Sequence, residues 1–293
     1  MLSAVPMPAA LRRLRERLFG FGPWDAGHIR DEWFRAHFGY AADLVQGWLG
    51  SALDLRQARL LNFGCGDGIT DLALVLRHGA TRIHGIDIRR EYAKLPRIAR
   101  EQLGLARLPT ALSFETIQPG APLAPRHAPV DGILSWSTFE HVAREQLLPI
   151  LRDLHACLRP GGVFFLQIEP LFHSPWGSHL RRYIDTPWQH LRVPEEALWR
   201  QIEAHQGPIA ADEVDFGFAD FGVEGYKRFV FREYQALNRL SADELVALAE
   251  QAGFALLRQE RRQVELAIPE TLLARYPEDW LRTNEILLLL GRS

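Results

Sequence analysis

The sequence predicts an α/β fold built on a doubly wound, mostly parallel sheet. Residues Leu60 to Thr70 (LLNFGCGDGIT) run from an apolar strand into a glycine-rich turn. A second apolar run, Arg82 to Ile88, carries the acidic residue Asp87 near its end. Strand-like and helix-like patterns alternate from about Ala58 to Pro170, as a parallel sheet requires.

The turn contains three glycines, Gly64, Gly66 and Gly68. Because glycine has no Cβ, the backbone can turn sharply there and approach a ligand closely. The apolar spacing of Ile69–Gly79 predicts a helix packed on one face, whose N-terminal amides point into the ligand site. A dinucleotide fingerprint needs its third glycine at position 69, where Ile69 stands, so the turn disfavours a dinucleotide.

The motif LNFGCGDG resembles the first motif of the class I S-adenosylmethionine-dependent methyltransferases. The resemblance implies a seven-stranded Rossmann-like sheet, a glycine loop around the methionine part of the cofactor, and Asp87 on the ribose hydroxyls. A carboxylate suits that role because it accepts strong, charge-assisted hydrogen bonds. The alternative is that Asp87 caps the segment Arg89–Tyr92. The predicted cofactor-binding residues are Asn62, Gly64, Cys65, Gly66, Gly68, Asp87, Ile88, Gln118 and Ser135.

Three later stretches extend the resemblance, which covers roughly residues 55–170 and 240–292. Asp131–Val142 resembles the fourth strand and its turn, Leu151–Glu169 the next helix and fifth strand, and Ser241–Leu257 the sixth helix and strand. In this family an acid often follows the third strand and binds the adenine amino group. Gln118 stands there and Glu115 is the nearest acid, so the adenine contact stays open.

The remaining segments are expected to surround this domain. Residues 1–50 are rich in aromatic side chains and are expected to form a helical lid, with a short basic amphipathic helix at Leu11–Phe19. The domain itself is assigned to residues 51–170 and 241–293, with a proline-rich loop at 118–129 and a buried strand at Ile286–Leu290. Residues 171–240 form an insertion that leaves from the sheet edge where such folds bind ligands, and we expect it to be a substrate cap.

Composition excludes several other classes of protein. The formal net charge of -2 gives no basic surplus, so nucleic acid is not the expected partner. Two cysteines, Cys65 and Cys157, rule out a disulfide framework and suit a reducing compartment, and we expect a cytoplasmic protein. No apolar run reaches the ~20 residues that span a bilayer. No Cys/His spacing is typical of a zinc site, and no metal is predicted.

Three histidines are candidates for a general base, which methyl transfer needs only when the acceptor is protonated, as a hydroxyl is. His141, with Glu140 beside it, follows the fourth strand, where the resemblance places the transferable methyl group. His173 and His179 lie in the insertion just past the fifth strand. Each has a purely architectural alternative.

The sequence therefore predicts methyl transfer from S-adenosylmethionine to a small-molecule or glycan acceptor, at oxygen. A few short segments, among them PWQHL at 187–191, are similar to bacterial methyltransferases of glycan biosynthesis. In that segment Trp188 is either a stacking face or a core residue. The alternatives are a non-catalytic binding module on the same fold and a nicotinamide-dependent oxidoreductase.

Overall fold

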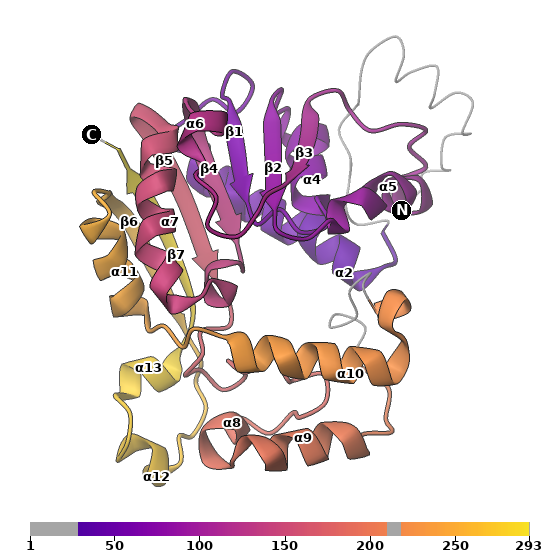
Figure 1. The fold of residues 1–293 in the computed structure, drawn as a ribbon, viewed down its shortest axis with the longest axis vertical. Coiled ribbons are helices and arrows are strands. Elements are labelled where there is room, and N and C mark those ends of the chain that lie inside the picture. The colour runs from indigo at the N-terminus through magenta and orange to yellow at the C-terminus, as the bar shows by residue number, and fades with distance from the viewer. Residues whose placement is uncertain (1–28, 210–217, 293) are drawn as a thin grey trace, which may run out of the picture. The chain divides into compact units, whose positions relative to one another are not determined.

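The computed structural model describes residues 29–209 and 218–292, in two compact units, 1–117 and 118–293. The strands form a seven-stranded sheet in the order β3-β2-β1-β4-β5-β7-β6 (Figure 1). Each neighbouring pair within a unit is parallel except those that involve β7, which is antiparallel to β5 and β6. The predicted mostly parallel, Rossmann-like sheet is confirmed. The predicted helix at Leu11–Phe19 lies outside the described residues.

The first unit contains the glycine turn. Its elements after residue 50 are β1 (Leu60–Phe63), α4 (Ile69–His78), β2 (Ile83–Asp87), the 3₁₀ helix η3 (Glu91–Lys94), α5 (Leu95–Leu103) and β3 (Leu112–Thr116). The helix predicted at 69–79 is α4, which begins directly after Gly68 and ends at Gly79. Gly79 has a φ of 74°, the left-handed conformation that commonly terminates a helix.

A helical segment precedes β1 in the same unit. It comprises α2 (Glu32–Arg35), a π-helical stretch η2 (Ala36–Ala41) and α3 (Ala42–Leu49). The guanidinium of Arg77 on α4 donates to the carbonyls of Phe38 and Gly39, at 2.8 and 3.1 Å, which fixes the segment on α4. The part of residues 1–50 that the structure describes is therefore helical, as predicted.

The second unit contributes β4, β5, β6 and β7 with their helices. Its sheet-side elements are α6 (Ala124–His127), β4 (Val130–Trp136), the 3₁₀ helix η4 (Phe139–His141), α7 (Arg144–Cys157), β5 (Leu158–Ile168), α11 (Ala242–Gln251), β6 (Ala255–Gln263) and β7 (Thr283–Gly291). The buried strand predicted at 286–290 is β7. The loop predicted at 118–129 contains the short helix α6, because the Asp153 carboxylate accepts hydrogen bonds from the Leu123 and Ala124 amides and caps its first turn.

The insertion at 171–240 contributes to a hydrophobic core separate from the sheet. Its helices are α8 (Gln189–Arg192), α9 (Glu195–Ala204) and α10 (Phe218–Ala236), and Figure 1 shows α9 and α10 side by side. Trp188 and Tyr226 are buried in this core, so Trp188 is a core residue and not an exposed stacking face. Leu272 of α12 (Glu270–Leu273) and Leu281 of α13 (Glu278–Arg282) pack into the same core. No sequence pattern predicted this second segment, between β6 and β7.

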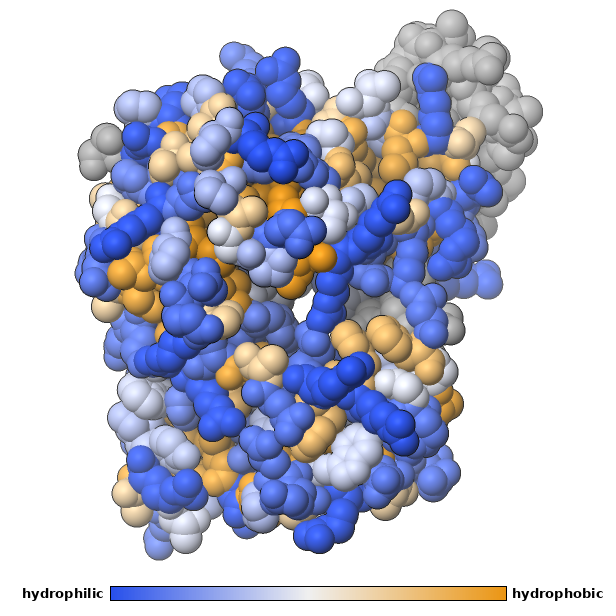
Figure 2. All heavy atoms as spheres, in the orientation of Figure 1, coloured by the Kyte–Doolittle hydropathy of each residue, from blue (hydrophilic) through white to orange (hydrophobic). Residues whose placement is uncertain are grey.

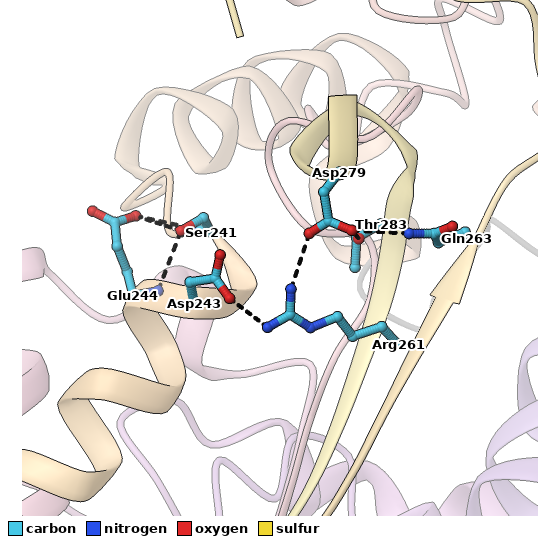
Figure 3. A network of polar contacts seen from close by, with 7 residues as sticks. All are labelled: Ser241, Asp243, Glu244, Arg261, Gln263, Asp279 and Thr283. Atoms are coloured by element: carbon cyan, nitrogen blue, oxygen red, sulfur yellow. Dashed lines mark hydrogen bonds and ion pairs between the residues drawn. The ribbon is translucent and has the colours of Figure 1, made fainter. Parts of the chain in front are cut away.

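The two segments share a core because their strands meet at one edge. Ile168 at the end of β5 pairs with Ile286, and Gln263 at the end of β6 pairs with Thr283, so both strands end beside the start of β7. Arg261 on β6 holds this edge by donating to Asp279 on α13, at 2.9 Å, and to Asp243 on α11 (Figure 3).

The outer surface mixes hydrophilic and hydrophobic residues over the face drawn in Figure 2. Among the described helices, none combines the length and the apolar character that a membrane crossing requires.

Candidate active site

The glycine turn adopts a backbone that favours glycine at three positions. The φ angles of Gly64, Gly66 and Gly68 are 77°, 54° and 77°, all in the left-handed region. A Cβ added to Gly66 would meet nothing within 4 Å, whereas one added to Gly68 would lie 2.8 Å from Cζ of Phe114. Gly66 therefore leaves open space where a ligand can approach the backbone, and Gly68 allows close packing.

Asp87 ends β2 beside this turn. Its Oδ2 accepts the amide of Gly66, at 2.9 Å, and its Oδ1 accepts the amide of Arg89, at 2.8 Å. The bond to Arg89 is a local turn and not a helix cap, because the N-cap of η3 is Arg90 and has no side-chain cap. A carboxylate has about four acceptor positions, so backbone amides leave room for a hydroxyl donor. Burial raises the pKa of Asp87, and the two amide bonds oppose the rise. Ile88 is 56% exposed, which suits a face for an adenine ring.

Asn62 and Asp71 form a buried pair beneath the turn. The amide of Asn62 donates to Asp71 Oδ1 at 2.7 Å, and burial raises the pKa of Asp71 to about 7. The thiol of Cys65 is also buried, which together with the Asp71 charge raises its pKa well above the usual value. Asn62 thus links the end of β1 to the first turn of α4 through Asp71, and the side chain of Cys65 is buried within the glycine turn.

Asp67 links the turn to the N-terminal helical segment. Its Oδ1 accepts the amide of Ile69 at 3.0 Å, and its Oδ2 accepts the indole NH of Trp33 at 2.9 Å. The sequence analysis did not single out Asp67 or Asp71. Their position between and just after the glycines was the available signal.

Gln118 and Ser135, the last two predicted cofactor residues, lie in the second unit. Gln118 is exposed and follows β3 in the chain. Ser135 is completely buried within β4. Their roles in cofactor binding stay predictions.

Two of the three candidate histidines lie together in the second unit. Glu140 and His141 belong to η4, just after β4, and His179 comes from the insertion. The ring centroids of His141 and His179 are 5.3 Å apart at an interplanar angle of 62°. Nδ1 of His141 lies 3.8 Å from Oε2 of Glu233 on α10.

Burial perturbs the acid–base behaviour of this cluster. It raises the pKa of Glu140 to about 8. It also lowers the pKa of His179 well below its usual value, and the neighbouring charge of His141 lowers it further. Groups with such shifts, placed beside one another, are typical of functional sites.

His173 does not join the cluster. Its ring packs against Tyr276 and Trp280, with centroid distances of 5.3 and 4.9 Å. Burial lowers its pKa to about 4. Nearby, Nε2 of His190 lies 2.7 Å from the carbonyl oxygen of Phe172.

A set of polar residues lies together at the ends of β4 and β5, and the sequence did not predict it. Ser137 donates its hydroxyl to Oε1 of Gln167, at 3.1 Å, and the Asn284 amide donates to Glu169 at 3.0 Å. Burial and the charge of Glu285 raise the pKa of Glu169 to about 7. No local motif marks these residues, because they come from β4, β5 and β7.

Comparison with known proteins identifies the family. A family model described as a methyltransferase domain matches residues 9–259. Since the match spans most of the chain, the chain belongs to this methyltransferase family and is an S-adenosylmethionine-dependent methyltransferase. A search of curated proteins finds no significant match.

Three solved methyltransferase structures are similar to this chain to different degrees. A putative sarcosine dimethylglycine methyltransferase from Galdieria sulphuraria aligns with a TM-score of 0.51 and 16% identity, covering 96% of this chain and 98% of that one. A methyltransferase from Mesorhizobium loti gives 0.49 and 17% identity over 87% and 100% of the two chains. Magnesium protoporphyrin IX methyltransferase from Synechocystis, crystallised with S-adenosylhomocysteine, gives 0.47 and 13% identity over 89% and 85%.

Alanine substitutions at Gly66 and at Gly68 should have different effects. The first should weaken ligand binding, and the second should disturb packing. Each substitution places a Cβ in the left-handed region, at a cost of about 1–2 kcal/mol. We expect Gly66→Ala to weaken binding of S-adenosylhomocysteine at least tenfold, because the Cβ enters the open space. Gly68→Ala should lower the melting temperature more, since Phe114 or Leu95 must move. Calorimetric titration and thermal unfolding measure the two effects. Unchanged affinity in Gly66→Ala would contradict a close approach of the ligand.

The buried Asp71 should make stability depend on pH. Its pKa rises from 3.8 to about 7 on folding, so the folded state holds a proton that the unfolded state releases. The free energy of unfolding should therefore fall as the pH rises from about 4 to 7, by about 4 kcal/mol at most. Asp71→Asn cannot ionise and still accepts from Asn62, so its urea-unfolding free energy should fall less over that range. If the free energy of unfolding fell with pH to the same extent in the wild type and in Asp71→Asn, this pH dependence would not come from Asp71.

Proposed function

We propose that this methyltransferase acts on a hydroxyl oxygen of a small molecule or glycan. The observation that carries the donor half of the proposal is the open space at Gly66 beside the partly satisfied carboxylate of Asp87. A donor with two vicinal hydroxyls needs both features: a backbone that it can approach and a carboxylate with acceptor positions left.

In this proposal the glycine turn holds the methionine part of the donor and Asp87 the ribose. Ile88, exposed next to Asp87, offers an apolar face to the adenine, and Gln118 is the candidate for the adenine amino group. When bound, S-adenosylmethionine supplies an electrophilic methyl group on a sulfonium, which leaves as a neutral thioether once the acceptor oxygen takes the methyl. The chain has to position and activate that oxygen, and positioning can supply roughly 7–11 kcal/mol of the barrier.

We assign activation of the acceptor hydroxyl to the cluster of Glu140, His141 and His179. The resemblance places the transferable methyl group beyond the fourth strand, and Glu140 and His141 follow β4. His179 lies in the insertion, to which we assign the role of a substrate cap. His173 receives no role in proton transfer, because a pKa near 4 makes it a weak base.

The segment at 29–49 contacts the glycine turn through Trp33 and Asp67, which supports a lid role over the donor. Cys65 and Cys157 are both unpaired and buried, which favours the cytoplasm as the location. Nucleic acid is not the proposed acceptor, since the chain has no basic surplus.

Removing the Asp87 carboxylate should weaken donor binding. Hydrogen bonds to a charged group contribute about 1.5–3 kcal/mol, so Asp87→Ala should raise the Kd for S-adenosylhomocysteine by about 10- to 100-fold. Isothermal titration calorimetry measures the change. Glu101→Ala, on the outer surface of α5, is the matched control and should bind as the wild type does. Equal affinity in Asp87→Ala would exclude this residue as the ribose ligand.

Removing a histidine of the cluster should slow turnover without weakening donor binding. A positioned group that activates a hydroxyl contributes about 10²–10⁴-fold to the rate. With an acceptor found by screening hydroxyl compounds for S-adenosylhomocysteine release, His141→Ala and His179→Ala should lower kcat by that order. The control is His155→Ala, on α7, whose ring packs on Phe254. An unchanged kcat in both cluster variants would refute the assignment.

A further inference from the structure

Glu140 is buried without a partner for its carboxylate. The residue is 5% exposed, and within the described part of the chain neither Oε1 nor Oε2 has a hydrogen-bond partner. Burying an unpaired carboxylate is strongly unfavourable, so native proteins pair such groups, protonate them or bind an ion to them. Two unsatisfied oxygens on one buried side chain therefore require an explanation.

Two imidazoles lie directly beside this carboxylate. Glu140, His141 and His179 each offer a ligand atom, and these three atoms lie within 4.8 Å of one another. Nε2 of His179 is itself buried and has no hydrogen-bond partner among the described residues. Glu140 and His179 also line the same small pocket, together with Phe172 and Asn238.

Asn238 holds in place the turn that carries Glu140 and His141. The Asn238 side-chain amide donates to the carbonyls of Phe139 and Val142, at 2.5 and 2.9 Å, on either side of Glu140 and His141. The Asn238 backbone amide donates to the Glu140 carbonyl at 3.0 Å. A side chain from the end of the insertion thus fixes the turn that carries two of the three donors.

The backbone of His179 is strained where it reaches the cluster. Its φ is 59°, a strained conformation that non-glycine residues seldom adopt. Successive turns precede it. The backbone amide of Ser174 donates to the carbonyl of Leu171, and the backbone amide of His179 donates to the carbonyl of Trp176. Such strain is retained where the position of a side chain has a function.

Nearby arginines are engaged elsewhere and do not neutralise Glu140. Arg239 lines the same pocket, but its guanidinium lies over the Phe172 ring, 5.1 Å from the centroid, and 3.4 Å from a Glu195 oxygen. The guanidinium of Arg182 donates to the hydroxyl of Tyr226. The pocket therefore keeps the Glu140 carboxylate and the His179 imidazole, and the ligand atom of His141 lies within 4.8 Å of theirs.

We propose that Glu140, His141 and His179 bind one divalent transition-metal cation. One carboxylate and two imidazoles suit zinc, manganese, iron or cobalt, whereas magnesium and calcium favour all-oxygen sites. Three protein donors leave coordination positions open, as in catalytic and not structural sites. Glu233, beside His141, is placed to orient that ring, the usual role of a carboxylate behind a metal-bound histidine.

The cation would explain how the cluster activates an acceptor, and this role rests on the proposed function. An acceptor oxygen at an open position would have its hydroxyl pKa lowered, so that the proton leaves to solvent water. The oxygen then forms its bond to the methyl carbon while the carbon–sulfur bond breaks and sulfur keeps the electron pair. Binding of the cation itself requires neither donor nor acceptor.

Metal titration of the whole protein tests the site. Protein without a histidine tag is stripped with EDTA, desalted and titrated with ZnCl₂, and separately with CoCl₂, in a calorimeter. We expect one cation per chain, with affinity at least tenfold lower in Glu140→Gln and in His179→Ala. His155→Ala, a histidine outside the cluster, should bind as the wild type does. Equal affinities in the wild type and the two cluster variants, or no binding by the wild type, overturn the proposal.

Thermal unfolding distinguishes a metal-binding role of Glu140 from a purely structural one. In EDTA, Glu140→Gln should melt at the wild-type temperature or above it, because a neutral amide is less costly to bury than a carboxylate. With excess Zn²⁺, the wild type should gain more than the variant, reversing or removing the difference. An equal gain in both proteins overturns the site. Failure of metal binding with intact binding of S-adenosylhomocysteine leaves the proposed methyl transfer standing, so the two proposals fail separately.

Discussion

The antiparallel pairing of β7 between β5 and β6 is the constraint on which the second unit depends. Because β7 enters the sheet in the opposite direction, the ends of β5 and β6 and the start of β7 lie at one edge. The chain leaves that edge twice, after β5 and after β6. The two segments share one hydrophobic core, in which Leu272 and Leu281 of the shorter segment pack with residues of the longer one. The insertion is thereby attached to the sheet at several points along one edge.

Three carboxyl groups, those of the buried Asp71 and Glu140 and of the partly buried Glu169, differ in their hydrogen-bond partners. Asp71 accepts from Asn62 and Glu169 from Asn284, so each has an amide partner that makes its burial tolerable. Glu140 has no such partner among the described residues, and its neighbours are two histidines. Burial raises the pKa of all three groups, so the shift alone does not distinguish them. The difference in partners is the reason why the proposed cation site includes Glu140 and not the other two.

Most of the first unit could be predicted from the sequence. The glycine turn, the helix after it and the strand ending at Asp87 follow from local chemistry: apolar runs, left-handed glycines and apolar spacing at the helical period. The division of roles among the glycines could not be predicted, because it depends on Phe114, which β3 brings against Gly68. The short helix α6 was missed for a similar reason, since Asp153, which caps it, lies on α7.

The sequence by itself determined the fold class, the methyltransferase family and the residues expected to hold the donor, because each is written in a contiguous pattern of a few residues. Tertiary structure alone decided which of the candidate histidines lie together. His173 and His179 lie close in the chain, yet one packs against Trp280 and the other meets His141. Side chains from separate segments are brought together only when the sheet edge and the insertion fold, and no spacing along the chain encodes that approach.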